Sequence, residues 1–458
     1  MKLTRRQFVA GAAAGAAAGA AGIYELVDSF AGGSPQRAAA AAALPEQHLL
    51  DGVRVVRSDG IEVLVPPLHD EILTAKVAVG RSDLRAAQVT LAGVLDGIDA
   101  DYGPSPAGVG VTLAWGLPYF ESFVPDATRR LMPHDRRADK SVLLPTSRFP
   151  SDPFDTRLEA NHVAILLRSD TRAHIDDAAK RIRGSKLFEL TSVRRGFAGG
   201  GFDGQRSLPK RMAQAAQIPG ADLIPDTAEL FLGFTSTQRA GIGPGPIANF
   251  ETLGYVDFRG SDYFLHGTHM ALSHIQEDLE AWYLNFDFDE RIATVFRPNL
   301  AVRQGTQTVR QGSADVSTAA DVHRDYRESG RIGHSASIQT TSRLVADHVG
   351  SDGTVYPKGT AIPIRADFNT LDNPFAWSRR ADEVGALSAA GVHFVVFNPT
   401  GDDFYRNRMA MDGVLPGGKI PFQPRDRGQG FNSVLSTTHR QNFLVPPRRH
   451  RSFPLAEV

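Results

Sequence analysis

The sequence predicts an α+β protein made of two similar halves, and two observations carry this prediction. In the first half, period-two strand patterns alternate with amphipathic helical patterns in the order β-α-β-β-α-β, which is the order of a ferredoxin-like unit. In the second half, strands and helices follow one another in a similar order. The length, 458 residues, leaves room for two or three average domains or one large double domain.

The first half contains four expected strands and two expected helices. The strands are Glu71–Gly80, Gly108–Leu117, Asn161–Ser169 and Leu187–Phe197, and the helices are Ser82–Asp99 and Asp170–Gly184. A stretch rich in Gly and Pro follows, Gly199–Pro246, which we expect to be a long loop that holds functional groups.

The second half begins with an expected strand, Asp262–Leu272, that leads into an amphipathic helix, Ser273–Asn285. The helix is predicted because Leu272, Ile275, Leu279 and Trp282 repeat at helical spacing. The remaining elements are strands at Gly359–Phe368 and Ala390–Thr400 and a helix at Gly401–Gly413. The tail from Lys419 is rich in Pro and Arg, and we expect it to wrap the surface.

Composition excludes several classes of function. The formal net charge is −1, so no global field favours nucleic acid or an anionic membrane, and we expect no nucleic-acid partner. The chain has no Cys, which excludes disulfides, thiolate catalysis and Cys-ligated metal centres.

The N-terminus has the pattern of an export signal. Basic residues precede an uncharged, weakly apolar stretch, and small-residue A-x-A sites follow near Ala38–Ala43. The pair Arg5 and Arg6 before Phe8 resembles a twin-arginine signal. We therefore expect an export signal and Ala-rich linker at 1–44, two halves at 45–246 and 247–458, and export by the twin-arginine machinery to the periplasm or the exterior.

A histidine-rich stretch raises the possibility of a metal site. His266, His269 and His274 are followed by a carboxylate cluster, and a mononuclear metal hydrolase would use the first two histidines with that cluster, Asp287, Asp289 and Glu290. The histidines are split between the expected strand and helix, and the carboxylates alternate with Phe as on a solvated face. Both features favour surface or core histidines over a metal site.

Six stretches that follow one another along the chain resemble dye-decolorizing (DyP-type) haem peroxidases, and the resemblance covers roughly Glu71 to Asp412. They are LAWGLPYFESFVP, AELFLGFTSTQ, YFLHGTHMALSHIQEDLEAWY, RIGHSASIQTTSR, IPIRADF and AGVHFVVFNPTGDDF. The resemblance implies a duplicated ferredoxin-like (dimeric α+β barrel) fold, with two antiparallel sheets and flanking helices. It also implies a bound haem b and the peroxide-dependent oxidation of a bulky organic donor.

The resemblance also implies roles for individual residues. His334 would be the proximal haem ligand, with Arg343 as a further cofactor-binding residue, and Arg365 and Asp367 would lie on the distal side. The chemistry agrees: without Cys, His is the usual ligand, and peroxide activation needs a proton-transfer group and a cation. Two alternatives stay open: His348 as the ligand, and a purely structural Arg365–Asp367 pair.

The expected distal loop departs from the family. At the matched Gly-x-x-Asp-Gly signature, Ser236 and Thr237 replace the acid and the second Gly, and Ser lacks the charge of a general base. A literal Gly-x-x-Asp-Gly lies upstream and makes Asp203 an alternative acid. The missing acid also favours a competing class, a non-catalytic descendant of the same fold that binds haem or another ligand.

Three aromatic residues, Trp282, Trp377 and Tyr405, either relay electrons or simply belong to the core. The expected partners are peroxide, an organic reductant and the export machinery. We expect a monomer or a homodimer.

Overall fold

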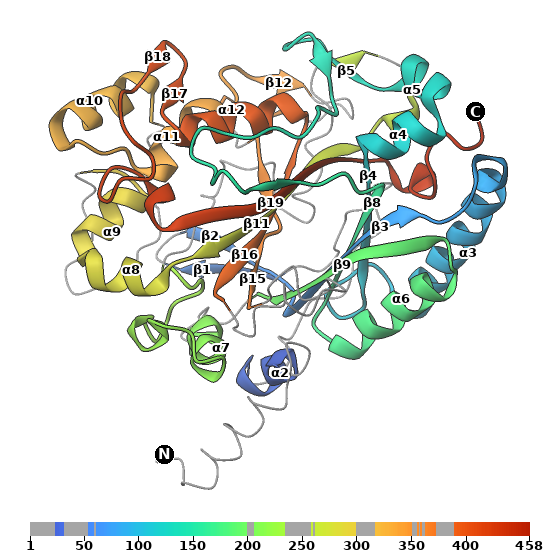
Figure 1. Cartoon of the computed structure of the whole chain (residues 1–458), viewed down its shortest axis with the longest axis horizontal. Coiled ribbons are helices and arrows are strands. Elements are labelled where there is room, and N and C mark those ends of the chain that lie inside the picture. Colours follow the sequence, from blue (N-terminus) through green and yellow to red (C-terminus); the bar gives the residue numbers. More distant parts are fainter. Residues whose placement is uncertain are drawn as a thin grey trace, which may run out of the picture.

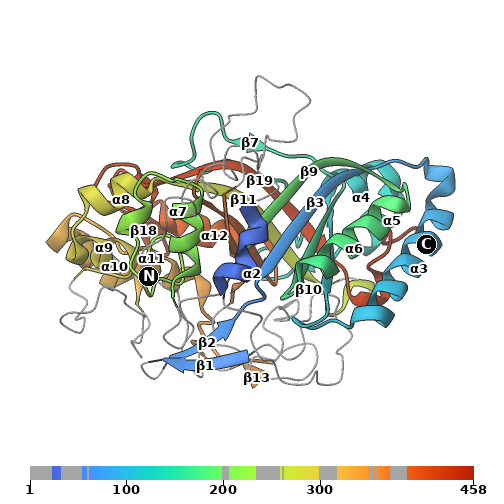
Figure 2. The same cartoon turned by 90° about the horizontal axis from the view of Figure 1, so that it is seen from below.

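The computed structural model describes residues 23–31, 54–58, 61–198, 206–233, 258–259, 262–298, 317–349, 355–356, 358–359, 362–371 and 389–458. A ten-stranded sheet lies at the centre, with helices at both ends (Figure 1). Seen from below, α3 and α6 lie at one end and α8 to α12 at the other (Figure 2). No helix among the described residues combines the length and apolar character needed to cross a membrane.

The first half forms four antiparallel strands with two helices. The strands are β3 (His69–Val77), β4 (Gly110–Gly116), β8 (Val163–Ser169) and β9 (Phe188–Phe197), and the helices are α3 (Leu84–Tyr102) and α6 (Arg172–Gly184). Their spatial order is β9-β3-β8-β4, so the fourth strand lies beside the first, and the third beside the second.

The second half repeats this spatial order. Its strands are β11 (Thr268–Glu277), β14 (Ile364–Arg365) with β15 (Phe368–Thr370), β16 (Gly391–Asn398) and β19 (Leu435–Val445). They are arranged β19-β11-β16-β15, again fourth, first, third and second. The repeated order confirms the predicted duplicated ferredoxin-like α+β fold.

The two halves join edge to edge and close the sheet into a barrel. One seam pairs β9 with β15, and the other pairs β4 with β19. The barrel interior contains a cluster of apolar side chains from both halves, including Ile72, Leu166, Leu272, Phe397 and Phe443. Burial of such side chains typically contributes about 1.5–3 kcal/mol each to stability, so the interior ties the two halves into one unit.

A bulge occurs at the same place in each half. The pairing of the first strand with the fourth shifts register between Thr74 and Ala75 in β3, and between His274 and Ile275 in β11. A bulge determines which side chains face each side of a sheet. Because the two bulges lie at the same place in the first strand of each half, the residues of β3 and β11 can be aligned one to one. Residue 73 then corresponds to 273, and residue 77 to 277.

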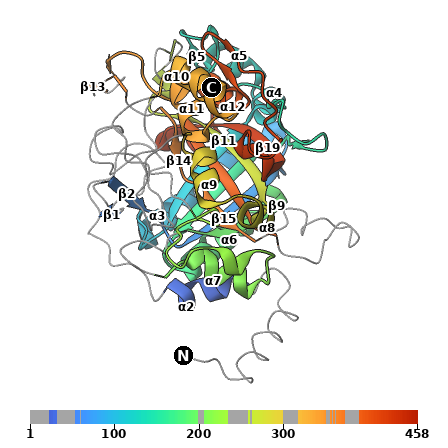
Figure 3. The ribbon, with the colours of Figure 1, turned by 90° about the vertical axis from the view of Figure 1, so that its left-hand side faces the viewer.

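Helices cover the outer face of each half in different ways. In the first half, α3 and α6 pack Leu91, Leu95, Ile98 and Ile175 directly onto the strands. In the second half the cover consists of shorter helices; in Figure 3, α9 lies in front of the strands, α10 to α12 toward the top and α7 toward the bottom. These are α7 (Leu208–Ala215), α8 (Leu279–Asn285), α9 (Phe288–Val295), α10 (Ala319–Ser329), α11 (His334–Ser342) and α12 (Gly401–Met411).

Further short elements decorate this framework. They are η1 (Ile23–Glu25), α2 (Leu26–Ala31), β1 (Arg54–Ser58), β2 (Ile61–Val65), α4 (Leu117–Phe123), α5 (Pro125–Leu131), β5 (His134–Asp135), β6 (Lys140–Ser141), β7 (Arg157–Leu158), β10 (Phe258–Arg259), β12 (His348–Val349), β13 (Val355–Tyr356), β17 (Val414–Leu415) and β18 (Gly418–Lys419).

Two predicted elements of the second half are wrong. The expected helix Ser273–Asn285 begins only at Leu279, because β11 continues to Glu277 between β16 and β19. The tail from Lys419 does not only wrap the surface, because it contains β19, which forms part of the barrel wall.

The segment Ile23–Ala31 packs against the barrel. Tyr24 and Val27 are buried, and the Tyr24 hydroxyl accepts a hydrogen bond from the Leu371 backbone N–H at 2.9 Å. This segment lies inside the expected export region 1–44, so cleavage near Ala38–Ala43 would remove a packed part of the structure. The expected boundaries at 44 and 246 themselves lie outside the described residues.

Candidate functional site

A cavity lies on the outer face of the second half, between strands β11, β16 and β19 and helices α11 and α12. It encloses about 1050 Å³, counting the part that is open to solvent. Apolar side chains, among them Phe394, Phe404 and Phe431, form much of its wall. The polar lining residues are Ser273, Glu277, His334, Ser335, Arg365, Asp367, Asn369, Arg408, Asn432, Thr437 and Arg440.

His334 is the first residue of α11, and Gly333 positions it. A Cβ atom at Gly333 would lie 2.2 Å from the Phe296 carbonyl oxygen, so only glycine allows the helix to start this close to the preceding segment. The imidazole lies 5.1 Å from the Phe431 ring between centroids. Its Nδ1 atom is buried and has no hydrogen-bond partner among the described residues.

The cavity keeps the His334 imidazole neutral. Burial and, to a smaller extent, the positive charges of Arg365 and Arg408 together lower the pKa of His334 to about 3. A neutral imidazole has a free nitrogen lone pair, which is the form that binds a metal or the iron of a haem. His334 is therefore a nitrogen donor that is not blocked by protonation near neutral pH.

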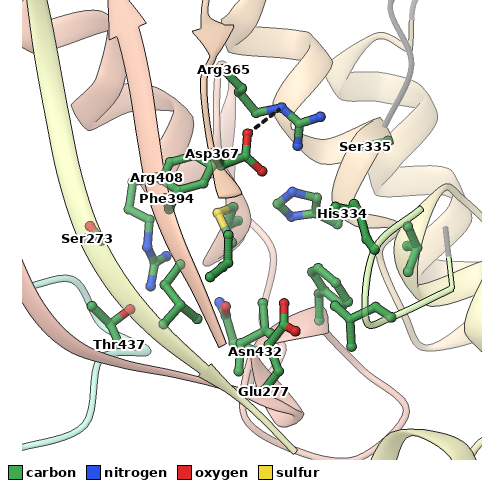
Figure 4. Close-up of a pocket in the computed structure, with 18 of the residues that line it drawn as sticks. Ser273, Glu277, His334, Ser335, Arg365, Asp367, Phe394, Arg408, Asn432 and Thr437 are labelled. Carbon is green, nitrogen blue, oxygen red and sulfur yellow. Dashed lines mark ion pairs between the residues drawn. The ribbon is translucent and has the colours of Figure 1, made fainter. Parts of the chain in front are cut away.

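Arg365 and Asp367 lie on the same wall of the cavity. Arg365 ends β14, where it pairs with Val396 of β16, and Asp367 follows in the link to β15. The Arg365 Nε atom is 3.8 Å from Asp367 Oδ1. Figure 4 shows this ion pair toward one end of the cavity, with His334 between it and Glu277 in that view. The structure thus brings together three residues that the sequence analysis singled out.

Glu277 is a cavity residue that the sequence analysis missed. It is the last residue of β11, and its carboxyl group lines the cavity while its Oε2 atom is buried without a hydrogen-bond partner among the described residues. Burial and, to a smaller extent, the negative charge of Asp367 together raise the pKa of Glu277 to about 8. The alternation of Ser273, Ile275 and Glu277 was the available signal, and it was hidden by the false helical spacing.

Two arginines of the wall are held by buried carboxylates. Arg408 of α12 donates to Asp412 Oδ1 at 3.1 Å and to Ser151 Oγ at 2.6 Å. Arg440 of β19 donates to Asp152 Oδ1 at 2.9 Å. These contacts fix both guanidinium groups at the edge of the cavity. No short motif predicted them, because their partners come from distant parts of the chain.

The remaining predicted site residues lie elsewhere or outside the described residues. Arg343 follows α11 and donates to the Gly359 carbonyl at 3.0 Å, and it is not among the cavity-lining residues. His348 begins β12, but its side chain is not described. Ser236 and Asp203 both lie outside the described residues, so their roles stay predictions.

The predicted electron-relay residues occupy different environments. Trp282 is fully buried, and its Nε1 donates to the Leu232 carbonyl at 3.0 Å. Tyr405 is 37% exposed and its ring lies 5.5 Å from that of Phe149. Trp377 lies outside the described residues. Trp282 therefore has a sufficient structural role as part of the core.

The described residues contain no arrangement for a metal hydrolase. No three side chains of His, Asp or Glu are placed to hold a metal ion within the described ranges. Asp287 and Glu290 instead form a capping box at the start of α9. His269 is buried near Phe404, and burial lowers its pKa to about 3.

Fold and cavity together define the class of protein: a closed α+β barrel of two ferredoxin-like halves, with a mostly apolar cavity that contains a neutral histidine. The chain belongs to a family of unknown function (DUF7405), which matches residues 67–447. No curated protein matches it in sequence.

Solved structures with a similar overall arrangement include DyP-type peroxidases. The enzyme from Cellulomonas bogoriensis is 16% identical, with 88% of this chain and 96% of that chain covered and a TM-score of 0.49. DyPB from Rhodococcus jostii RHA1 is 12% identical, with 84% and 95% covered and a TM-score of 0.48. The encapsulated DyP-type peroxidase from Mycobacterium smegmatis is 12% identical, with 85% and 96% covered and a TM-score of 0.47. The strand order described above defines the fold.

Proposed function

We propose that the cavity binds haem b through His334 and that the loaded protein uses peroxide to oxidise an organic donor. One observation carries the proposal. A neutral histidine with an unpaired buried nitrogen shares a largely apolar cavity with the Arg365–Asp367 ion pair. These are the three chemical groups that a haem peroxidase without Cys requires: a nitrogen ligand, a cation and a proton-accepting group.

The described residues fit a haem group. A haem has a flat apolar ring with two acidic substituents, and it needs one axial donor from the protein. His334 offers the donor, and Phe394, Phe404 and Phe431 offer apolar walls. Arg408 and Arg440 offer positive charge at the edge of the cavity, where acidic substituents could be bound.

The chain's own residues have distinct tasks in this proposal. Bound haem would supply the redox chemistry. Arg365 places a positive charge beside the position where negative charge develops as the peroxide O–O bond breaks. Asp367, held by Arg365, accepts a proton from the incoming peroxide. The apolar walls exclude water, which strengthens both electrostatic effects.

Export is part of the same proposal. The support is the sequence pattern around Arg5 and Arg6, which is typical of proteins exported in the folded state. A protein that must acquire haem before export would use such a route. The reaction would then take place in the periplasm or outside the cell.

The visible spectrum of the purified protein tests the activity. After addition of haem we expect a Soret band, which changes on addition of peroxide and returns when a bulky organic donor is oxidised. A Soret band that does not respond to peroxide would instead support the non-catalytic haem-binding alternative. A protein that stays colourless after haem is added would contradict both.

A further inference from the structure

The cavity contains two carboxyl groups in different environments. Asp367 pairs with Arg365, so a cation balances its charge. Glu277 forms no ion pair among the described residues, and its Oε2 atom is buried without a hydrogen-bond partner. When two carboxyl groups of one site have such different surroundings, one commonly acts as the acid and the other as the base.

The position of Glu277 is not explained by the fold. In the first half, the aligned position is Val77, which packs in the apolar core under α3 and α6. The scaffold therefore accepts an apolar side chain at this point of the first strand. A carboxyl group without a partner costs stability at such a place, so its presence points to a role in the cavity.

We propose that Glu277 is the proton donor of this cavity, and that it protonates the departing oxygen of peroxide directly or through one water molecule. This assignment rests on the proposed function. Overall, one peroxide, two protons and two electrons from the organic donor give two waters. As the O–O bond breaks, the departing oxygen takes the proton of Glu277, which becomes a carboxylate and later recovers a proton from solvent.

The other cavity groups do not supply this proton. Burial keeps the pKa of His334 near 3, so its imidazole carries no spare proton at neutral pH. Arg365, Arg408 and Arg440 do not release protons in this range. Asp367 pairs with Arg365 and serves as the proton acceptor of the site, so the proton for the departing oxygen comes from a second group. Burial raises the pKa of Glu277 to about 8, so its carboxyl group is protonated at neutral pH and still releases a proton readily.

The charges around Glu277 determine its pH dependence. Burial favours the protonated form of Glu277, and so does the negative charge of Asp367 from the β14–β15 link. Arg365, Arg408 and Arg440 line the same cavity and keep their positive charge in this range. His334 of α11 is neutral. Tyr283 of α8 interacts with Glu277, and burial raises the pKa of this tyrosine, so it is also neutral. Glu277 is therefore the group of this set that changes charge between pH 5 and pH 9.

A first experiment needs no haem. Because the folded state raises the pKa of Glu277 from its ordinary value of 4.5 to about 8, the stability that its protonated form contributes is complete below pH 4.5 and is lost as the pH rises to 8. We expect the Tm of Glu277→Gln, relative to that of the wild type, to increase steadily from pH 5 to pH 8.5. The matched control Glu280→Gln, on the exposed side of α8, should show a constant difference.

The second experiment uses haem-loaded protein and stopped-flow mixing with peroxide. Glu277→Gln should slow the reaction by about 10²–10⁴-fold, the usual range for general acid–base catalysis. Glu277→Asp should recover part of the rate, and Glu280→Gln should react like the wild type. Equal rates for wild type and Glu277→Gln across pH 5–9, with haem bound in both, would overturn the assignment of Glu277 alone.

The haem spectra recorded in the same samples separate this assignment from the proposed function. If the wild type takes up no haem, the proposed function fails and the assignment fails with it. If haem binds and the relative Tm of Glu277→Gln does not change with pH, the carboxyl group is not held in its protonated form, and the assignment is wrong while haem binding stands.

Discussion

The two halves of the barrel have the same strand order but differ in what covers their outer faces. In the first half, the strands meet α3 and α6 mainly through apolar side chains, and Leu73 and Val77 belong to that core. In the second half, the aligned residues are Ser273 and Glu277, and both line the cavity. On the fourth strand, Val193 of the first half likewise corresponds to Arg440 of the second.

This difference teaches how a duplicated fold can acquire a site. The barrel interior contains an apolar cluster to which both halves contribute, so it supplies stability for both halves. One outer face is then free to exchange apolar contacts for polar and charged groups. The cost of that exchange is offset locally by ion pairs, such as the one between Arg440 and Asp152. Mutations on the two faces should therefore have effects of different origin and size.

The largest effect should come from the ion pairs of the second half. Asp152 is almost fully buried and pairs with Arg440 and Arg408. Asp152→Asn leaves both guanidinium groups without this carboxylate, and we expect a loss of about 3–5 kcal/mol at pH 7. Urea unfolding measures it. A loss below about 1 kcal/mol would show that solvent or other carboxylates already balance these charges.

The pH dependence of this variant has a definite sign. Burial alone would raise the pKa of Asp152, but hydrogen bonding and the charges of Arg440 and Arg408 outweigh it and lower the pKa below its ordinary value of 3.8. The contribution of Asp152 is therefore present above pH 3.8 and is lost as the pH falls further. The stability difference between wild type and Asp152→Asn should shrink in acid and stay constant from pH 5 to pH 8.

The next effect distinguishes the two outer faces directly. Leu73→Ala removes a fully buried side chain from the first half and should cost about 2–5 kcal/mol. Ser273→Ala, at the aligned position in the second half, removes only a hydroxyl that accepts a 3.3 Å hydrogen bond from Arg440. It should cost about 0.5–1.5 kcal/mol. Equal losses in urea unfolding would mean that the second face is packed as a core and not as a cavity.

A smaller effect is expected at the seam between β9 and β15, which the N-terminal segment covers. Tyr24→Phe leaves the buried Leu371 backbone N–H without its acceptor, and we expect a loss of about 1–3 kcal/mol.

The same packing predicts the N-terminus of the exported protein. Mass spectrometry should find a mature chain that still contains Ile23–Ala31, and a chain that begins after Ala43 would contradict this.

The sequence predicted the elements well where long apolar runs mark buried strands, as in β4 and β8, or where apolar residues follow a helical spacing. The strand Ala390–Thr400 and the strands and helices of the first half appear within a few residues of their expected limits. Prediction failed at β11 because the barrel interior and the cavity cover both faces of this strand. Leu272 faces the interior and Ile275 faces the cavity, so the alternation disappears and a helical spacing arises by coincidence.

The strand β19 was missed for a related reason. Its residues from Leu435 to Gln441 are mostly polar, because several of them face the cavity or form buried hydrogen bonds. The resemblance to a known family located His334, Arg365 and Asp367, which the structure brings into one cavity. Glu277, Arg408 and Arg440 could not be found in this way, because their role depends on which elements the fold brings together.

The central claim is that the outer face of the second half binds haem through His334, and an absorbance titration with haem tests it most directly. The wild type should bind one haem per chain and develop a Soret band, and His348→Ala should behave in the same way. His334→Ala should fold normally by circular dichroism and form no specific complex. A wild type that binds no haem, or a His334→Ala variant that binds it as tightly as the wild type, would contradict the claim.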